Sequence, residues 1–227
     1  MIRTDSFFAN AMAVTSQGEI WAFGSSPVRA SAPADLLTLR RFAPDGRQIA
    51  GYLPWSGFDP PDGMPPKDPA SGRKLTAADV RESVTVMGNH GGSHVVTSRS
   101  RVGVFSGRTA TWVEFDLDGN QIDRFLVNPP AADDPKSTHD ITSMAMTADN
   151  RVYASFAYHD PKNNGLFELD RTTHKWTRVP KPFTAPGFGG LYGVDGNSLI
   201  LRSGCCQYGW VDAPDVIGAV QSVAANQ

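Results

Sequence analysis

The sequence is poor in the residues that build helices and membrane spans. It has only 4 Glu beside 19 Asp and only 6 Lys beside 15 Arg. Because Glu and Lys favour helices, this scarcity disfavours a helical protein. A membrane-spanning helix requires about 18 apolar residues in a row, and no apolar run approaches that length. No membrane span is therefore predicted. The net charge of −2 gives no basic surface, and nucleic-acid binding is not expected.

The residues that are abundant indicate an all-β fold. The chain of 227 residues contains 22 Gly and 17 Pro, which together with Asp populate turns. Apolar residues make up 40% of the chain and charged residues 19%, which is enough for a hydrophobic core and too little charge for a disordered protein. This composition predicts many short strands joined by turns, in one domain over residues 1–227.

Cysteine and targeting signals leave the cellular compartment open. The only cysteines, Cys205 and Cys206, are adjacent, with Cα atoms about 3.8 Å apart, so a disulfide between them would be strained. Two reduced thiols, a vicinal disulfide and a soft-metal contact remain the alternatives. Residues 1–20 lack an apolar segment behind a basic start, so no signal peptide is predicted. An extracytoplasmic location stays open if the natural chain begins upstream.

One structural plan recurs four times along the chain. Each copy has an apolar strand, a tight polar turn and a second strand rich in aromatic residues, over residues 11–23, 94–105, 144–156 and 191–203. A further strand, turn and strand follow the first three copies, over residues 36–53, 112–126 and 165–179. Each complete unit is therefore a four-stranded antiparallel meander of about 45 residues, and its repetition is typical of a β-propeller.

The turn motifs carry a more specific resemblance. Phe115-Asp116-Leu117-Asp118-Gly119, Phe42-Ala43-Pro44-Asp45-Gly46 and Asp195-Gly196-Asn197 resemble the blades of NHL-type and related six-bladed propellers. The third unit departs from the pattern, with Asp170-Arg171-Thr172-Thr173 in place of Asp-Gly. The resemblance implies a propeller fold and little about activity, since propellers host enzymes, scaffolds and ligand binders alike.

The length sets the number of blades at about four. A six-bladed ring would need about 250 residues or more at this repeat length. A small closed ring, with residues 1–6 supplying an outer strand, and a partial propeller remain open alternatives. No fourth strand follows Tyr208–Val211 in the last unit. Instead, Pro214-Asp215 predict the start of a short C-terminal helix with Val216, Ile217, Val220 and Val223 on one side.

Loop lengths single out one end of the blades as the functional face. The turns after the first and third strands are tight, whereas the connections after the second and fourth strands are mostly long. The largest insertion, residues 54–83, is rich in Pro and reads as an irregular loop with one short helix before Glu82. Long loops on a rigid scaffold often build binding sites, so we predict a protein or small-molecule ligand on this long-loop face.

Candidate site residues gather at the same face. The predicted binding residues are His90, His139, Asp140, His159, Trp55 and Phe58. Aligning the inner strands on Thr15, Thr97 and Thr147 places Phe8, His90 and Asp140 at equivalent positions, at the mouth of the central channel. His90, His139 and Asp140 are therefore the candidate ligands of a divalent metal, with solvated or turn-capping residues as the alternative.

Three functions follow from these patterns. The first is a non-catalytic binding or protein-interaction propeller, favoured because Ser25, Ser93 and Ser106 lack a G-x-S-x-G context. The second is a metal-dependent lactonase or hydrolase. Related six-bladed lactonases hold Ca²⁺ or Zn²⁺ through Glu, Asn and Asp, where this chain has Phe8, His90 and Asp140. The third is a structural subunit whose exposed blade edges pair with another chain, as a homo-oligomer or by accepting additional blades.

Overall fold

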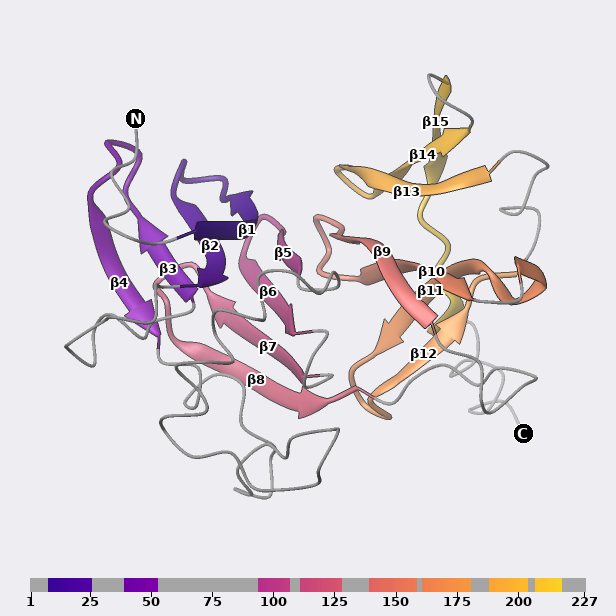
Figure 1. The fold of residues 1–227 in the computed structure, drawn as a ribbon, viewed down its shortest axis with the longest axis horizontal. Helices are drawn as coiled ribbons and strands as arrows, with labels where there is room; N and C mark the ends of the chain where they lie inside the picture. Colours follow the sequence, from indigo (N-terminus) through magenta and orange to yellow (C-terminus); the bar gives the residue numbers. More distant parts are fainter. Residues whose placement is uncertain are drawn as a thin grey trace. The chain divides into compact units, whose positions relative to one another are not determined.

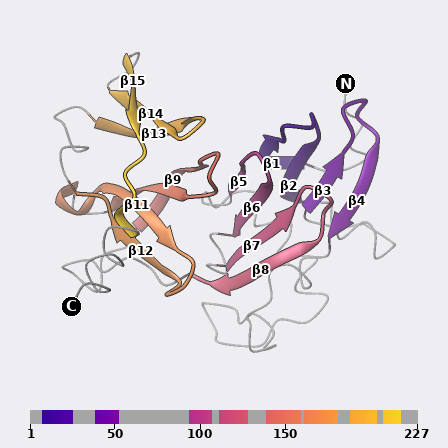
Figure 2. The same cartoon turned by 180° about the vertical axis from the view of Figure 1, so that it is seen from behind.

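The computed structural model describes residues 8–25, 39–52, 94–106, 111–127, 139–158, 161–180, 188–203 and 207–217. These residues form an all-β fold of four antiparallel sheets, the blades of a β-propeller (Figure 1, Figure 2). Three blades have four strands, and the fourth has three described strands. The predicted fold class is therefore confirmed.

Each blade is a simple meander in chain order. Blade 1 contains β1 (Phe8–Val14), β2 (Ile20–Ser25), β3 (Leu39–Phe42) and β4 (Gln48–Tyr52). Blade 2 contains β5 (His94–Thr97), β6 (Arg101–Ser106), β7 (Thr111–Asp116) and β8 (Gln121–Leu126). Blade 3 contains β9 (His139–Met146), β10 (Val152–Tyr158), β11 (Gly165–Asp170) and β12 (Lys175–Arg178), and blade 4 contains β13 (Phe188–Asp195), β14 (Ser198–Ser203) and β15 (Gln207–Asp212).

The chain divides into two compact units, Met1–Leu126 and Val127–Gln227, which hold two blades each. In the first unit, one apolar core joins blades 1 and 2, with Trp21 of β2 against Phe115 of β7 at a ring-centroid distance of 5.2 Å. In the second unit, the core joins Tyr153 and Leu166 of blade 3 to Leu199 of blade 4. Blades within a unit therefore pack face against face.

Both faces of a central strand are consequently buried. Residues 111–115 of β7 and 165–169 of β11 are all buried, including the polar side chains of Thr111, Glu114 and Glu168. Trp21, Trp112 and Trp176 are buried in their strands. Burying a large apolar side chain contributes roughly 1.5–3 kcal/mol, so these residues are major anchors of the blades.

The Asp-Gly pairs form the tight turns that the sequence predicts. Gly46 and Gly119 adopt φ of 86° and 93°, in the left-handed region that glycine tolerates without strain. In the third unit, where Asp-Gly is missing, His174 takes the left-handed position with φ of 57°. Asp170 holds that longer turn by accepting the backbone N–H groups of Thr172 and Thr173. A side-chain cap thus replaces the missing glycine.

The C-terminal end of the described chain turns helical at 216–217, directly after Pro214-Asp215, where the sequence predicts a helix start. Val220, Val223 and the predicted helix before Glu82 lie outside the described residues. The insertion 54–83 and the other long connections also lie outside them. The tight turns are described in all four blades, and they are as short as predicted.

Candidate functional site

Most of the predicted binding residues lie outside the part of the chain that the structure describes. These are Trp55, Phe58, His90 and His159. His139 and Asp140 are the first two residues of β9, where their backbones pair with Tyr158 and Ala157 of β10. The predicted binding set and the predicted divalent-metal set therefore remain predictions.

The alignment behind the predicted channel-mouth site holds for two of its three positions. Phe8 pairs with Ser25 and Asp140 with Ala157, and each lies seven residues before a turn threonine. A register shift occurs in both strands at the same distance from that threonine, at Asn10 and at Thr142. Phe8 and Asp140 are thus equivalent, as predicted.

The third position is displaced by one residue. Thr15 and Thr147 open their turns by accepting the N–H groups of Glu19 and Arg151 on their hydroxyls. In blade 2, Ser98 does so, accepting from Arg101, whereas Thr97 donates to the Val14 carbonyl. Because the turn of blade 2 is one residue shorter, Ser98 is the counterpart of Thr15 and Thr147. Aligning on Thr97 was therefore wrong by one residue, which removes the register argument that grouped His90 with Asp140.

No group of three His, Cys, Asp or Glu side chains is placed to hold a metal ion within the described ranges. Two further histidines belong to other elements: His94 opens β5, and His174 occupies the turn before β12. The described residues offer other polar and aromatic groups, which follow.

A buried carboxylate organises blade 2. Glu114 of β7 is fully buried and accepts from the guanidinium of Arg101 at 2.5 Å and from the indole N–H of Trp112 at 3.0 Å. The two donors leave both carboxylate oxygens bonded. Glu114 thereby links β6 to β7 within the blade.

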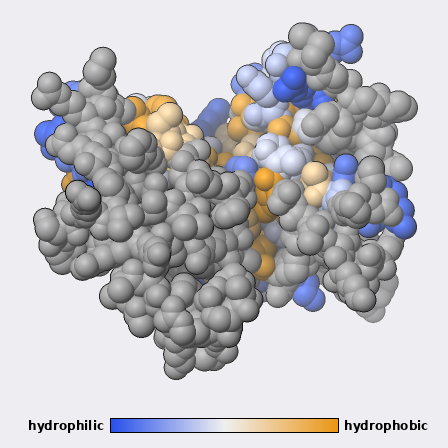
Figure 3. All heavy atoms as spheres, viewed as in Figure 1, coloured by the Kyte–Doolittle hydropathy of each residue, from blue (hydrophilic) through white to orange (hydrophobic). Residues whose placement is uncertain are grey.

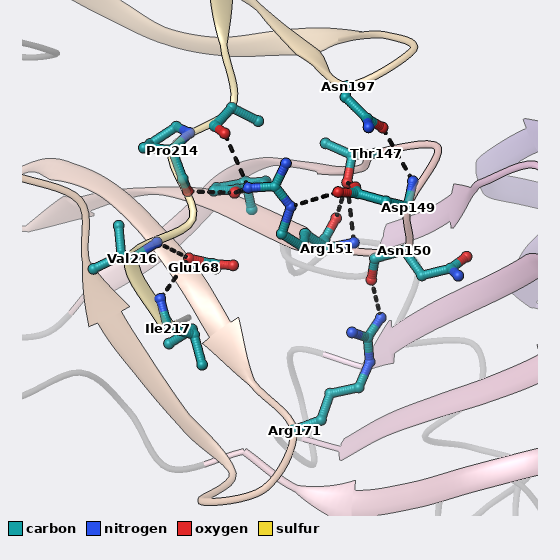
Figure 4. Close-up of polar contacts among 12 residues, drawn as sticks. Thr147, Asp149, Asn150, Arg151, Glu168, Arg171, Asn197, Pro214, Val216 and Ile217 are labelled. Atoms are coloured by element: carbon teal, nitrogen blue, oxygen red, sulfur yellow. Dashed lines mark hydrogen bonds and ion pairs between the residues drawn. The ribbon is translucent and has the colours of Figure 1, made fainter. Parts of the chain in front are cut away.

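The equivalent carboxylate of blade 3 is bound differently. Glu168 of β11 is 2% exposed and accepts the backbone N–H groups of Val216 at 2.9 Å and Ile217 at 3.2 Å (Figure 4). Burial raises the pKa of Glu168, an effect opposed by these two N–H groups and reinforced by the negative charge of Asp215. Glu168 thus ties the C-terminal helical turn to blade 3.

The charged groups around Glu168 are also engaged. Arg151 donates to the Asp149 carboxylate at 2.9 Å and to the Ala213 carbonyl at 2.9 Å (Figure 4). The hydroxyl of Tyr153 donates to the Pro214 carbonyl at 2.6 Å, and burial raises the pKa of Tyr153 far above its usual value. A tyrosine held neutral by burial and already donating to a carbonyl is a structural link, and we assign no catalytic role to it.

Blade 1 uses the same two positions with the charges reversed. Glu19 stands where blades 2 and 3 have Arg101 and Arg151, and Arg41 stands where they have Glu114 and Glu168. The guanidinium of Arg41 binds Glu19 at 2.6 Å and also donates to the Leu117 and Asp118 carbonyls of blade 2. Arg41 therefore fastens blade 1 to blade 2.

An exposed aromatic face lies on blade 4. Tyr192 of β13 and Tyr208 and Trp210 of β15 are 63%, 44% and 61% exposed. The rings of Tyr192 and Tyr208 meet edge to face, with centroids 4.9 Å apart. The opposite face of the same sheet, with Leu191 and Leu199, is buried in the core of the unit. We call Tyr192, Tyr208 and Trp210 the aromatic face.

Polar side chains frame the aromatic face. Arg202 pairs across the strands with Tyr208, and Ile200 pairs with Trp210, so both share that face. At the far end, the Ser198 hydroxyl donates to Asp212 at 3.4 Å. Tyrosine, tryptophan and arginine around an apolar centre are the residues enriched where proteins bind one another.

Sequence reasoning missed this face, although the signal was present. Tyr208-Gly209-Trp210 places two aromatic side chains on one side of a strand, because side chains alternate. Exposed apolar residues occur also in blade 1, where Met12 and Val14 of β1 are exposed and apolar atoms show over β1 and β2 (Figure 3). Those two are aliphatic and lack an aromatic partner in the described chain.

Within the described residues, no helix is long and apolar enough to cross a membrane.

No family model and no curated protein matches the chain. Similar solved structures include a streptogramin B lyase, with a TM-score of 0.37 and 13% identity over 90% of this chain, and this chain spans about half of that protein, 54%.

Two further similar structures are a catalytically inactive virginiamycin B lyase from Staphylococcus aureus with quinupristin and a protein of unknown function from Bacteroides caccae. Their TM-scores are 0.36 and 0.34, their identities 9% and 12%, and the matches cover 93% and 92% of this chain and 72% and 79% of those chains. We transfer no residue role at these identities. Its four antiparallel blades give the chain a fold-level resemblance to β-propeller proteins.

Proposed function

We propose that the protein is a non-catalytic binding module that recognises another protein through the aromatic face of blade 4. The observation that carries this proposal is the joint exposure of Tyr192, Tyr208 and Trp210 on one side of a sheet whose other side is core. Water contact with three large aromatic side chains is unfavourable, and covering them with a partner recovers that free energy.

The chemistry of the described charged groups supports binding rather than catalysis. Glu114, Glu168 and Arg41 are each bonded to at least two partners inside the fold. Each therefore holds strands, blades or the chain end together. A catalytic acid or base needs a reactive atom within reach of a substrate, which these networks do not offer.

The aromatic face extends toward the end of blade 4 from which the longer connections leave. Ser203 pairs with Gln207 and Phe188 at that end, directly before residues 204–206. Tyr208 follows Gln207 in β15. The proposed surface thus adjoins the long-loop face predicted from the sequence, and the insertion 54–83 remains a second, separate candidate for binding.

Three variants test the proposal by quantitative capture from native extract. We expect Tyr192→Ala/Trp210→Ala to lose the captured protein while keeping the wild-type unfolding midpoint, because both side chains are exposed. The matched control, Met12→Ala/Val14→Ala, removes equally exposed apolar residues from blade 1 and retains capture. Replacing residues 54–83 by a short Gly-Ser linker separates the loop from the aromatic face. Capture that survives in Tyr192→Ala/Trp210→Ala would refute the proposal.

A further inference from the structure

Within the described residues, blade 4 ends on an edge strand, β15. The strand order is β13-β14-β15, whereas each other blade continues to a fourth strand. β15 pairs with β14 along its whole length, from Ser203 with Gln207 to Ser198 with Asp212, and its residues 207–210 are all exposed. A strand in this position presents backbone donors and acceptors to any further strand that aligns with it.

The exposed edge lacks the devices that usually prevent pairing. Natural edge strands are protected by Lys, Pro or inward-pointing charges. Residues 207–211 of β15, Gln-Tyr-Gly-Trp-Val, contain no charge and no proline. At Gly209, no described atom lies within 4 Å of where a Cβ would stand, so a cysteine can be placed there for cross-linking.

The sequence of β15 is complementary to itself in antiparallel pairing. If two copies align with Gly209 opposite Gly209, Tyr208 of each copy faces Trp210 of the other. Aromatic residues opposite each other on paired strands are among the stabilising cross-strand pairs. In the same alignment, the start of β15 in one copy lies beside the end of β15 in the other. Arg202, which pairs with Tyr208, and Asp212 of the other copy therefore place unlike charges at the same end of the joined sheet.

We propose that two copies of this chain pair through β15, antiparallel and centred on Gly209, to form one continuous sheet from two blades. This inference rests on the proposed function, since it names the partner of the aromatic face as a second copy. The contact is isologous, because the same strand serves both copies. It is small for a permanent dimer, so we expect a dissociation constant of about 10 µM or weaker.

Charge complementation tests the pairing. Tyr208→Glu/Trp210→Glu places like charges opposite each other in the dimer, as does Tyr208→Lys/Trp210→Lys. By sedimentation equilibrium and native mass spectrometry, we expect the wild-type chain to dimerise with rising concentration and each charged variant to remain a monomer. An equimolar mixture of the two variants regains a heterodimer. The matched control, Met12→Glu/Val14→Glu, dimerises as the wild type does.

Cross-linking keeps the proposal testable if the charged variants fold poorly. In a Cys205→Ser/Cys206→Ser background, Gly209→Cys lies opposite itself and forms a disulfide-linked dimer on mild oxidation, whereas Met12→Cys does so far more slowly. A wild-type chain that stays monomeric throughout, or charged variants that dimerise as it does, would overturn the pairing. Monomeric wild type with Trp210-dependent capture of another protein overturns this inference and leaves the proposed function standing.

Discussion

Blades 2 and 3 place the same two charged residues at equivalent positions and use them differently. In blade 2, Arg101 and Glu114 bind each other directly. In blade 3, Arg151 pairs with Asp149, while Glu168 accepts two backbone N–H groups from the chain end. In blade 2 the carboxylate forms an ion pair within the blade, whereas in blade 3 it binds the chain segment at Val216 and Ile217.

Two neighbouring positions differ between the blades. Gly103 stands across from Glu114 in β6, whereas Tyr153 stands across from Glu168 in β10. Two residues before the carboxylate, Trp112 donates its indole N–H to Glu114, whereas blade 3 has Leu166, which has no side-chain donor. The Tyr153 hydroxyl instead donates to the Pro214 carbonyl, next to the segment whose Val216 and Ile217 N–H groups bind Glu168.

We expect the largest loss of stability from Glu114→Ala in blade 2. It leaves the buried Trp112 indole N–H without this acceptor and removes the charge-assisted bond from Arg101, which together cost about 3 kcal/mol. Urea unfolding of the variant and the wild type measures this loss. A change below about 1 kcal/mol would show that the pair is not the anchor of blade 2.

Glu168→Ala in blade 3 costs less, about 2 kcal/mol, for the loss of two hydrogen bonds to a charged group. Its partners are backbone N–H groups near the end of the described chain, and water can replace the carboxylate there. Hydrogen exchange at Val216 and Ile217 rises in this variant while blade 2 keeps its protection. A loss as large as that of Glu114→Ala would contradict the contrast between the blades.

Tyr153→Phe removes the hydroxyl that links β10 to Pro214 and costs about 1 kcal/mol, the net value of an ordinary hydrogen bond. Thermolysin digestion near Val216 and Ile217 becomes faster in this variant. An unchanged digestion rate together with an unchanged unfolding midpoint would show that the chain end is held by Glu168 alone.

The stability contributed at Glu168 depends on pH. Because the folded-state pKa of Glu168 is raised, its protonation favours folding, and this contribution is complete below the unfolded value and is lost as pH rises through the folded value. The stability of the wild type relative to Glu168→Gln therefore increases as pH falls from 7 toward about 4.3. A difference that is flat with pH would refute the raised pKa.

Asp149 responds in the opposite direction. The pKa of Asp149 is lowered, because hydrogen bonds from Thr147 and Arg151 and the charge of Arg151 outweigh the effect of burial. Its contribution is present above the unfolded value and is lost as pH falls through the folded one. Denaturation of Asp149→Asn and the wild type should converge only in strong acid, and convergence already at pH 5 would contradict this assignment.

The smallest effect belongs to an exposed pair in blade 1. Arg47 and Asp45 lie 4.0 Å apart with both side chains about seven-tenths exposed. Arg47→Ala should change the free energy of unfolding by less than about 0.5 kcal/mol, because solvent screens such pairs. A larger loss would mean that surface pairs in this chain matter as much as the buried pair of blade 2.

The sequence predicted the strands and tight turns because these follow from local chemistry. Alternating side chains and the Asp-Gly pairs at Asp45 and Asp118 determine them residue by residue. The one-residue error at Thr97 arose because the turn of blade 2 is shorter, and only the hydrogen bonds of Ser98 reveal that. Arg41 donates to the Leu117 carbonyl of the neighbouring blade. Such a contact depends on how two blades pack against each other, and no local sequence pattern predicts it.

For the candidate site, the sequence supplied residue types without their surroundings. It predicted a strand at Tyr208–Val211, yet whether Tyr208 and Trp210 face core or solvent depends on which face of blade 4 packs against blade 3. His139 and Asp140 are the first two residues of β9. Whether their side chains lie near residues of the long connections depends on the tertiary structure, and their shared site stays a prediction.

The reversed charges of Glu19 and Arg41 have a consequence for how the repeats sort during folding. Similar repeats are prone to exchange hairpins with one another. If the first hairpin of blade 1 joined the second hairpin of blade 2, Glu19 would meet Glu114, and the reciprocal exchange would bring Arg101 against Arg41. Both exchanges would oppose like charges, so the opposite polarity of the two blades makes these exchanged pairings less favourable than the native ones.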